Sequence, residues 1–255
     1  MQLPDIIEEI DYETLQSDTL EFLKGLTVLE TEFLESDPVM LVVESLLYRE
    51  MLLRARINES LRASYLLTAT GGNLDVIAYG YGVERLADES DERLRERCLL
   101  SLSRFSTAGA EDTYIYWAKT VSAQIKEATV LNPGAGAVEI VYHSDEDHTD
   151  AILATCSSDD VRPLSDQVSV TKATVKSKEL YLTVELMDGY DIITVRNNIT
   201  EAFGSLPLGI GDDLTLAQIL HTAHVDGVYK VTETSENGDR NANEREVIQP
   251  IIYFN

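Results

Sequence analysis

The sequence predicts an α+β protein with a helical N-terminal half that contains one long bundle-forming helix, followed by two small mixed α/β modules. Three observations predict this fold class. Apolar residues recur at helical spacing up to about residue 121. After about residue 122, short alternating segments separated by turn residues replace that pattern. Strands and helices then follow one another without strict alternation, which favours α+β modules over a doubly wound sheet.

The first helical segment is expected over residues 12–34, with a break at Gly25. The turn at residues 35–38 supplies an N-cap and places Pro38 at the first helical position of a second helix. This second helix is expected to run to about residue 68 and to stop at the double glycine 71–72, where glycine can adopt the left-handed C-cap conformation. A helix of that length spans roughly 46 Å.

The long helix carries more apolar side chains than one stripe requires. A narrow apolar stripe suits a helix that lies on its own domain, whereas a broad one suggests contact on two sides. Two interpretations remain open from the pattern alone: a helix buried in its own core, and a helical bundle shared with another chain. The residues expected at a shared interface are Val39, Val42, Val43, Leu46, Leu47, Leu53 and Ile57.

A compact helical module is expected next, with helices over residues 73–81, 91–105 and 111–121. Each of them follows a polar or glycine-containing break. The last contains Trp117, which is the single tryptophan of the sequence.

The remainder is expected to form two mixed modules. A hairpin around residues 132–134 joins the first two strands, and a later strand places Leu180, Leu182, Val184 and Leu186 on one face. The expected strands are residues 126–131, 137–142, 168–175, 178–186, 227–232 and 247–254, and the expected helices are residues 150–157, 191–203 and 214–223. The domain organisation expected from these elements is 1–68, 69–122, 123–177 and 178–255.

The protein is strongly acidic, with 45 acidic and 20 basic residues and a formal net charge of -25. Such a field repels phosphate backbones, so we expect no direct binding of nucleic acid. The sharpest local excess lies in residues 1–37, which hold 11 acids and one base, Lys24. A segment of that composition needs either water or a basic partner around it.

No uninterrupted run of about 18 apolar residues is present, so no membrane-spanning helix is expected. The N-terminal residues 1–11 are acidic where a signal peptide has a basic start, and we expect assembly in the cytoplasm of the cell that makes the protein. Cys98 and Cys156 are far apart and fit neither a disulfide framework nor a zinc site; both are expected to be small buried or semi-buried residues.

Candidate metal sites are weak. His143 and His148 flank an acidic loop that can in principle bind a hard cation, although acidic loops are usually just solvated. His221 and His224 lie three residues apart on an expected helix, but no HExxH motif or third ligand accompanies them. We therefore expect no metal and no cofactor.

Catalytic motifs are also lacking. The glycine-rich segment 204–211 has no Lys-Ser/Thr ending and does not open a βαβ unit after a buried strand, so neither nucleotide-binding fingerprint is met. A G-x-S-x-G elbow does not occur. The sequence thus supplies no catalytic residue, and we expect a protein that is not an enzyme.

Five segments in order resemble the phage baseplate J-like family, which also occurs in tailocins and related contractile injection systems. They are ESDPVMLVVESLLYREMLLRARINES (35–60), ATGGNLDVIAYGYGVERL (69–86), ESDERLRERCLLSLSRFSTAGA (89–110), VRPLSDQVSV (161–170) and HVDGVYKV (224–231). Each alone can arise from caps and turns, whereas five in register are specific.

The resemblance implies a structural baseplate wedge protein located in the virion tail baseplate. Its N-terminal helices would form a bundle with a second copy and a tail-protein-I-like wedge partner. The later modules would contact neighbouring copies in an iris-like ring around the hub, close to the sheath, and control sheath contraction. In this pattern the VRPL segment is a loop that leads into a strand, and two interpretations of Arg162 remain open: it holds that turn, or it is a surface arginine. Two other hypotheses are a tail-associated hydrolase or lytic enzyme, and a free-standing acidic adaptor or nucleic-acid mimic.

Overall fold

The computed structural model describes residues 8–26, 37–105, 111–234 and 239–255. The chain divides into two compact units, Met1–Glu84 and Arg85–Asn255, and each is described by itself. The first unit is helical, and the second contains helices and two small sheets. The expected fold class, a helical N-terminal half followed by mixed α/β modules, is confirmed.

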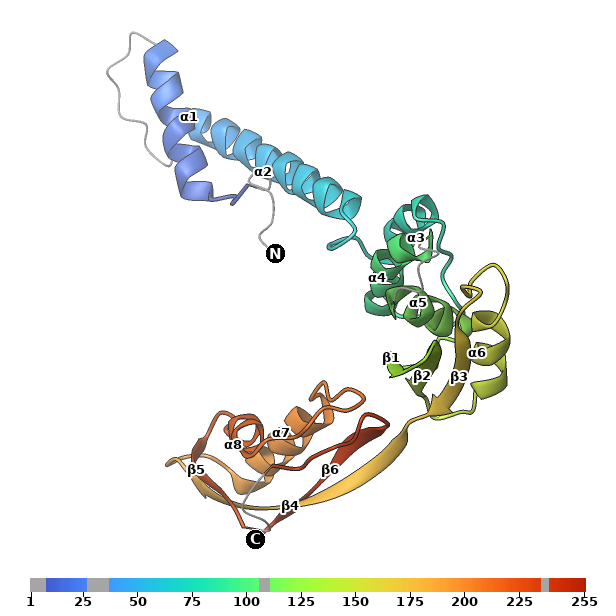
Figure 1. The fold of residues 1–255 in the computed structure, drawn as a ribbon. Coiled ribbons are helices and arrows are strands. Elements are labelled where there is room, and N and C mark those ends of the chain that lie inside the picture. Colours follow the sequence, from blue (N-terminus) through green and yellow to red (C-terminus); the bar gives the residue numbers. More distant parts are fainter. Residues whose placement is uncertain (1–7, 27–36, 106–110, 235–238) are drawn as a thin grey trace. The chain divides into compact units, whose positions relative to one another are not determined.

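The first unit holds α1 (Tyr12–Leu26), α2 (Pro38–Ser64) and α3 (Gly71–Gly80). α1 packs on α2 (Figure 1), and Glu8, just before α1, is tied to the far part of α2. The Asn58 amide accepts from the Glu8 backbone N–H at 3.2 Å and donates to the Glu8 carbonyl at 2.8 Å. Arg54 adds an ion pair to the Glu8 carboxylate at 2.9 Å.

The long helix begins as expected, with Asp37 at the N-cap and Pro38 in the first turn. Its end was predicted wrongly, because it stops at Ser64 and Tyr65 is already extended. The Thr68 hydroxyl donates to the Arg62 carbonyl at 2.5 Å and so satisfies one of the free carbonyls of the last turn. The double glycine opens α3 instead of closing α2, and Gly71 has a φ of 52° that L side chains rarely adopt.

The second unit begins with α4 (Asp91–Leu100), the 3-10 helix η1 (Ser101–Phe105) and α5 (Glu111–Val121). A buried ion pair holds the start of this module together. The Arg97 guanidinium donates to the Glu89 carboxylate at 2.7 Å, and both side chains are almost fully buried. Arg93 donates to the Lys119 and Ser122 carbonyls at 2.8 and 2.7 Å, which ties α4 to the end of α5.

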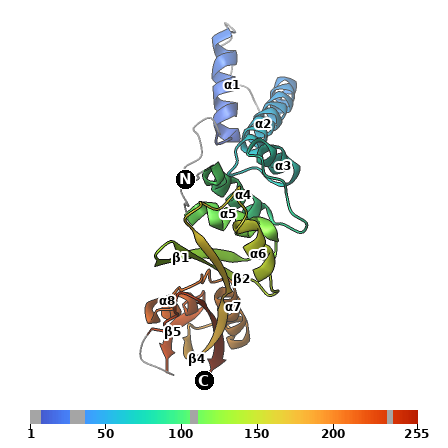
Figure 2. The same cartoon turned by 45° about the vertical axis from the view of Figure 1, so that its right-hand side comes forward.

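The first sheet has the strand order β1-β2-β3. β1 (Glu127–Gly134) and β2 (Ala137–His143) form the expected antiparallel hairpin, and α6 (Thr149–Cys156) connects β2 to the parallel strand β3 (Gln167–Lys172). α5 and α6 pack together on this sheet (Figure 2). Their shared core includes Tyr114, Ile140, Ile152 and Cys156.

The second sheet has the order β5-β4-β6, with β4 (Thr174–Leu186) in the centre. β5 (Val228–Glu233) pairs with it antiparallel and β6 (Glu246–Phe254) parallel. α7 (Ile192–Gly204) and α8 (Leu216–Ala223) cover one face. The alternation predicted for β4 is confirmed, because Leu180 and Leu182 lie in this core and Val184 and Leu186 pack against it.

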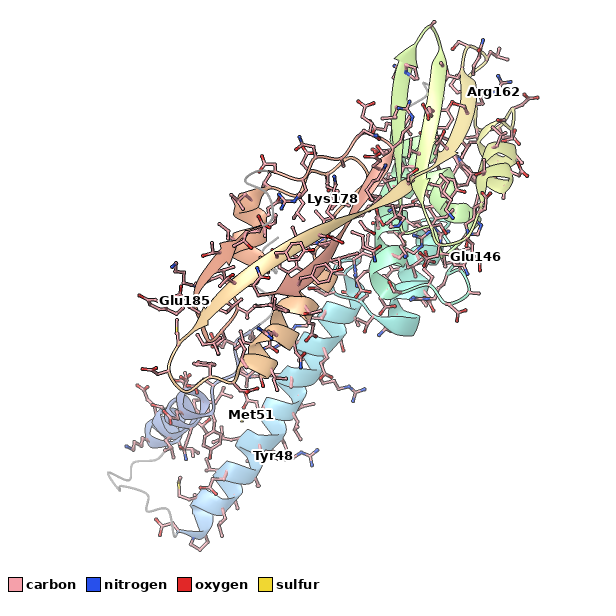
Figure 3. All side chains as sticks on the ribbon, turned by 90° about the horizontal axis from the view of Figure 1, so that it is seen from below. Tyr48, Met51, Glu146, Arg162, Lys178 and Glu185 are labelled. Atoms are coloured by element: carbon pink, nitrogen blue, oxygen red, sulfur yellow. The ribbon has the colours of Figure 1, made fainter. Side chains whose placement is uncertain are left out.

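The loop before β3 is held by Arg162, as the family pattern implies. Its guanidinium donates to the Asp166 carbonyl at 2.9 Å, one residue before the strand begins (Figure 3). The Tyr114 hydroxyl, on α5, donates to the Asp166 carboxylate at 2.8 Å. These two contacts fix the point where the chain enters the sheet.

A second polar cluster organises the turn before α6. The Tyr142 hydroxyl donates to the Asp147 carboxylate at 2.8 Å and accepts from the His148 backbone N–H at 2.9 Å. Asp147 also accepts from the backbone N–H and the hydroxyl of Thr149, at 2.9 and 2.7 Å. These hydrogen bonds, with those of Thr149 first, lower the pKa of Asp147 from its ordinary 3.8 to about 2.

We therefore expect acid to remove a stabilising contribution of Asp147. A carboxyl whose pKa is depressed in the folded state stabilises the fold above its unfolded pKa and loses this effect as the pH falls from about 4 to about 2. Urea unfolding of the wild type and of Asp147→Asn, followed across this range, checks it. The difference in unfolding free energy between the two proteins should shrink as the pH falls; a difference that is constant with pH would contradict the assignment.

Candidate functional site

The long helix α2 carries several large apolar side chains that remain exposed in the described part of the chain. One side is buried within the unit and carries Met40, Val43, Leu47 and the amide of Asn58. α1 and the segment at Glu8 lie on this side. The buried residues recur at three, four and eleven positions, which is the spacing of one helix face.

A second face of α2 is apolar and exposed. We call it the outer stripe; it consists of Val39, Val42, Leu46, Leu53 and Ile57. Their exposed fractions lie between 51% and 61%. At about 100° per residue these five positions fall within one narrow sector of the helix, about 110° from the buried side.

The seven interface residues predicted from the sequence therefore divide between two faces. Five form the outer stripe, and Val43 and Leu47 lie on the side that the unit covers, at 6% and 1% exposure. Helical spacing placed all seven on an apolar helix, but only the packing of α1 separates the two faces. The interface itself remains a prediction for the five exposed residues.

A third group on α2 is absent from the predicted interface. Leu41, Tyr48 and Leu52 are 64%, 63% and 53% exposed. They recur at spacings of seven and four residues, so the same helical periodicity could have identified them. α2 thus has three apolar faces, of which one is covered by its own unit.

The free energy available at the outer stripe is substantial. Full burial of an aliphatic side chain contributes about 1.5–3 kcal/mol of free energy. Burial of these five half-exposed side chains would therefore contribute several kcal/mol to binding. Isolated exposed apolar residues are common on proteins, whereas larger exposed apolar patches are associated with interaction sites.

The histidines considered as metal ligands lie in different parts of the fold. Across residues 8–26, 37–105, 111–234 and 239–255, no group of three or more His, Cys, Asp or Glu side chains is arranged to hold a metal ion. His148 is the N-cap residue of α6, and His221 and His224 lie at the end of α8. Burial and then Lys126 lower the pKa of His143.

The glycine-rich loop 204–211 makes an internal contact. The Ile210 backbone N–H donates to the Glu127 carboxylate at 2.9 Å, and a Cβ on Gly209 would lie 2.7 Å from the same carboxylate. The loop thus connects the second sheet module to β1 of the first. Arg245 and Glu139 make a further link between these modules at 2.6 and 2.8 Å.

In the part of the chain that the structure describes, no helix has both the length and the apolar character needed to cross a membrane.

The comparisons with known proteins agree with the resemblance of the sequence motifs. Residues 35–90 match the baseplate J-like N-terminal domain, and residues 106–172 match the baseplate J-like central domain. The chain is also similar to "Baseplate protein J" of Escherichia phage P2. The two are 30% identical over 260 residues, which cover 89% of this chain and 86% of that protein.

Proposed function

The chain belongs to the baseplate J-like family and is a structural protein of the phage tail baseplate, and from this premise we propose that it is a wedge subunit of a contractile tail. Its task in the wedge is to hold other baseplate proteins together. The observation that carries the proposal is the outer stripe of α2, a row of five exposed apolar side chains. Exposure of these apolar side chains to water is unfavourable, and their burial in an assembly is favourable.

We propose two kinds of partner for the helices of residues 1–68. One is a second copy of the chain and the other is a tail-protein-I-like wedge protein. Support comes from the two exposed apolar faces of α2, because a helix with free faces on two sides can contact two further helices at once.

For the remaining domains we propose contacts with neighbouring wedges. Residues 69–122 connect the bundle to the ring, residues 123–177 form the ring, and residues 178–255 make dimer or ring contacts next to the hub and the sheath-proximal proteins. Their two separate cores support this division. The links Glu139–Arg245 and Glu127–Ile210 suit modules that move as one body when the ring opens.

If each copy uses the same two surfaces for its neighbours and the rotation between copies closes, the repeated contacts form a ring. Opening of such an iris-like ring would release the sheath for contraction.

Co-expression with the adjacent tail genes, followed by electron microscopy of the purified product, tests the proposal. We expect closed rings of repeating wedges in which α2 lies in a helical bundle. A chain that stays monomeric and joins no tail protein under these conditions would overturn the wedge assignment.

A further inference from the structure

The third apolar face of α2 is bordered by two arginines. Leu41, Tyr48 and Leu52 lie on one helix face, and Tyr48 is labelled on α2 in Figure 3. Arg49 and Arg56 are exposed and lie two turns apart, in the sector between this face and the outer stripe. We call Tyr48, Leu52, Arg49 and Arg56 the arginine seam.

The seam is unusual in a protein of net charge -25. α2 carries Arg49, Arg54, Arg56 and Arg62 against three glutamates, so its own net charge is positive. Arg54 is engaged internally, with the carboxylates of Glu50 and Glu8 at 2.7 and 2.9 Å. Among the described residues, no carboxylate forms an ion pair with Arg49 or Arg56, so the seam is available to an acidic partner.

The chain itself carries a surface of the complementary kind. On α1, the residues that face α2 are partly covered, whereas Asp18, Glu21 and Phe22 lie on the outer side and are exposed. Phe22 is 66% exposed, with Asp18 one turn before it. α1 thus presents an aromatic side chain beside two carboxylates, and this combination matches two arginines beside an apolar face.

We infer that the arginine seam of α2 binds the outer face of α1 from a second copy of this chain. Phe22 of one copy packs on Tyr48 and Leu52 of the other, and Asp18 and Glu21 pair with Arg49 and Arg56. The chain's own α1 cannot make this contact, because it occupies the side of α2 that carries Val43 and Leu47. The inference rests on the proposed self-pairing in the wedge and specifies the surfaces that perform it.

A second copy fits better than an unrelated chain for two reasons. Each copy contributes one acidic α1 and one arginine seam. A two-fold dimer therefore makes the contact twice, and each copy uses the same two surfaces. It also leaves the outer stripe free for a different wedge partner. Self-pairing and binding of the wedge partner would therefore use different faces of α2.

Charge reversal with rescue tests the inference in the full chain. Sedimentation equilibrium at low salt should show a dimer for the wild type, and Arg49→Glu with Arg56→Glu should weaken its association at least about tenfold. Adding Asp18→Arg and Glu21→Arg to the same chain should restore the association, because both partners then carry reversed charges. Arg62→Glu is the matched control, on the same helix but on another face, and should leave the dimer unchanged.

A second measurement covers the case in which the charge variants do not fold. Both native cysteines are buried, so a chain with Phe22→Cys and a differently tagged chain with Leu52→Cys can be mixed and oxidised. A disulfide-linked heterodimer supports the contact, and its absence overturns it. A wild-type chain that is monomeric at every concentration, or a reversal that leaves the dimer intact, also overturns it. The wedge proposal would survive these failures if co-expression still yields rings.

Discussion

Aspartate at both Leu46 and Leu53 is expected to abolish co-purification of the chain with its wedge partner. Both side chains belong to the outer stripe and are 61% and 60% exposed, so the isolated chain should tolerate the change. In a bundle each aspartate would be buried against apolar side chains, and an unpaired polar group in such a place costs at least about 1–3 kcal/mol. The two substitutions together cost at least about 2 kcal/mol and should weaken binding at least about 30-fold, because each 1.4 kcal/mol is tenfold. Pull-down of the tagged partner followed by titration calorimetry measures the effect.

The control is aspartate at an equally exposed apolar position outside the stripe. Val76 on α3 is 75% exposed, and the protein that carries Val76→Asp should bind the partner with unchanged affinity. Val43→Asp is not a suitable test of the interface, because Val43 is buried within the unit and its replacement would disturb the packing of α1. Unchanged affinity of the Leu46→Asp/Leu53→Asp protein would show that the outer stripe is not the binding surface.

Replacement of Arg97 by methionine is expected to cause the largest loss of stability, about 3–5 kcal/mol, because it leaves a buried carboxylate without its main partner. The Glu89 and Arg97 side chains are 0% and 2% exposed and lie 2.7 Å apart. Arg93 approaches the same carboxylate only at 3.5 Å and compensates in part. Urea unfolding monitored by far-UV circular dichroism gives the free energy.

The double substitution Glu89→Gln/Arg97→Met is the matched control. It removes both charges of the Glu89–Arg97 pair together, and Arg93 keeps its hydrogen bonds to the Lys119 and Ser122 carbonyls, so the protein should lose less stability than the single variant. The side-chain amide introduced at position 89 can still accept from the Leu86 backbone N–H, which in the wild type donates to the Glu89 carboxylate at 2.9 Å. A single variant that is no less stable than the double variant would show that the ion pair is not the source of the effect.

Local patterns predicted the elements of this fold well. Asp37 and Pro38 mark the start of α2 because a cap and a proline are determined by adjacent residues. The alternation of β4 identified Leu180 and Leu182 as core because side chains on a strand point alternately to two faces. The end of α2 was misplaced, because the helix stops at Ser64, where the Tyr65 backbone N–H and the Thr68 hydroxyl both donate to the Arg62 carbonyl, and not at the double glycine.

The candidate interface was predictable only in part. The periodicity of α2 showed that it was apolar on more than one side, and the five residues of the outer stripe are indeed exposed. Which side is covered depends on the packing of α1, so Val43 and Leu47 could not be distinguished from their neighbours. Contacts such as Glu139 with Arg245, 106 residues apart, leave no local signal at all.

The outer stripe of α2 is expected to become buried when the chain joins other baseplate proteins. Cys98 and Cys156 are buried, so a cysteine introduced as Ile57→Cys can be labelled selectively with a maleimide. Asp159→Cys, at a side chain that is 98% exposed, reports on general accessibility. We expect rapid labelling at position 57 in the isolated chain and strong protection in the assembled wedge, with position 159 labelled alike in both. Equally rapid labelling at position 57 before and after assembly would contradict this expectation.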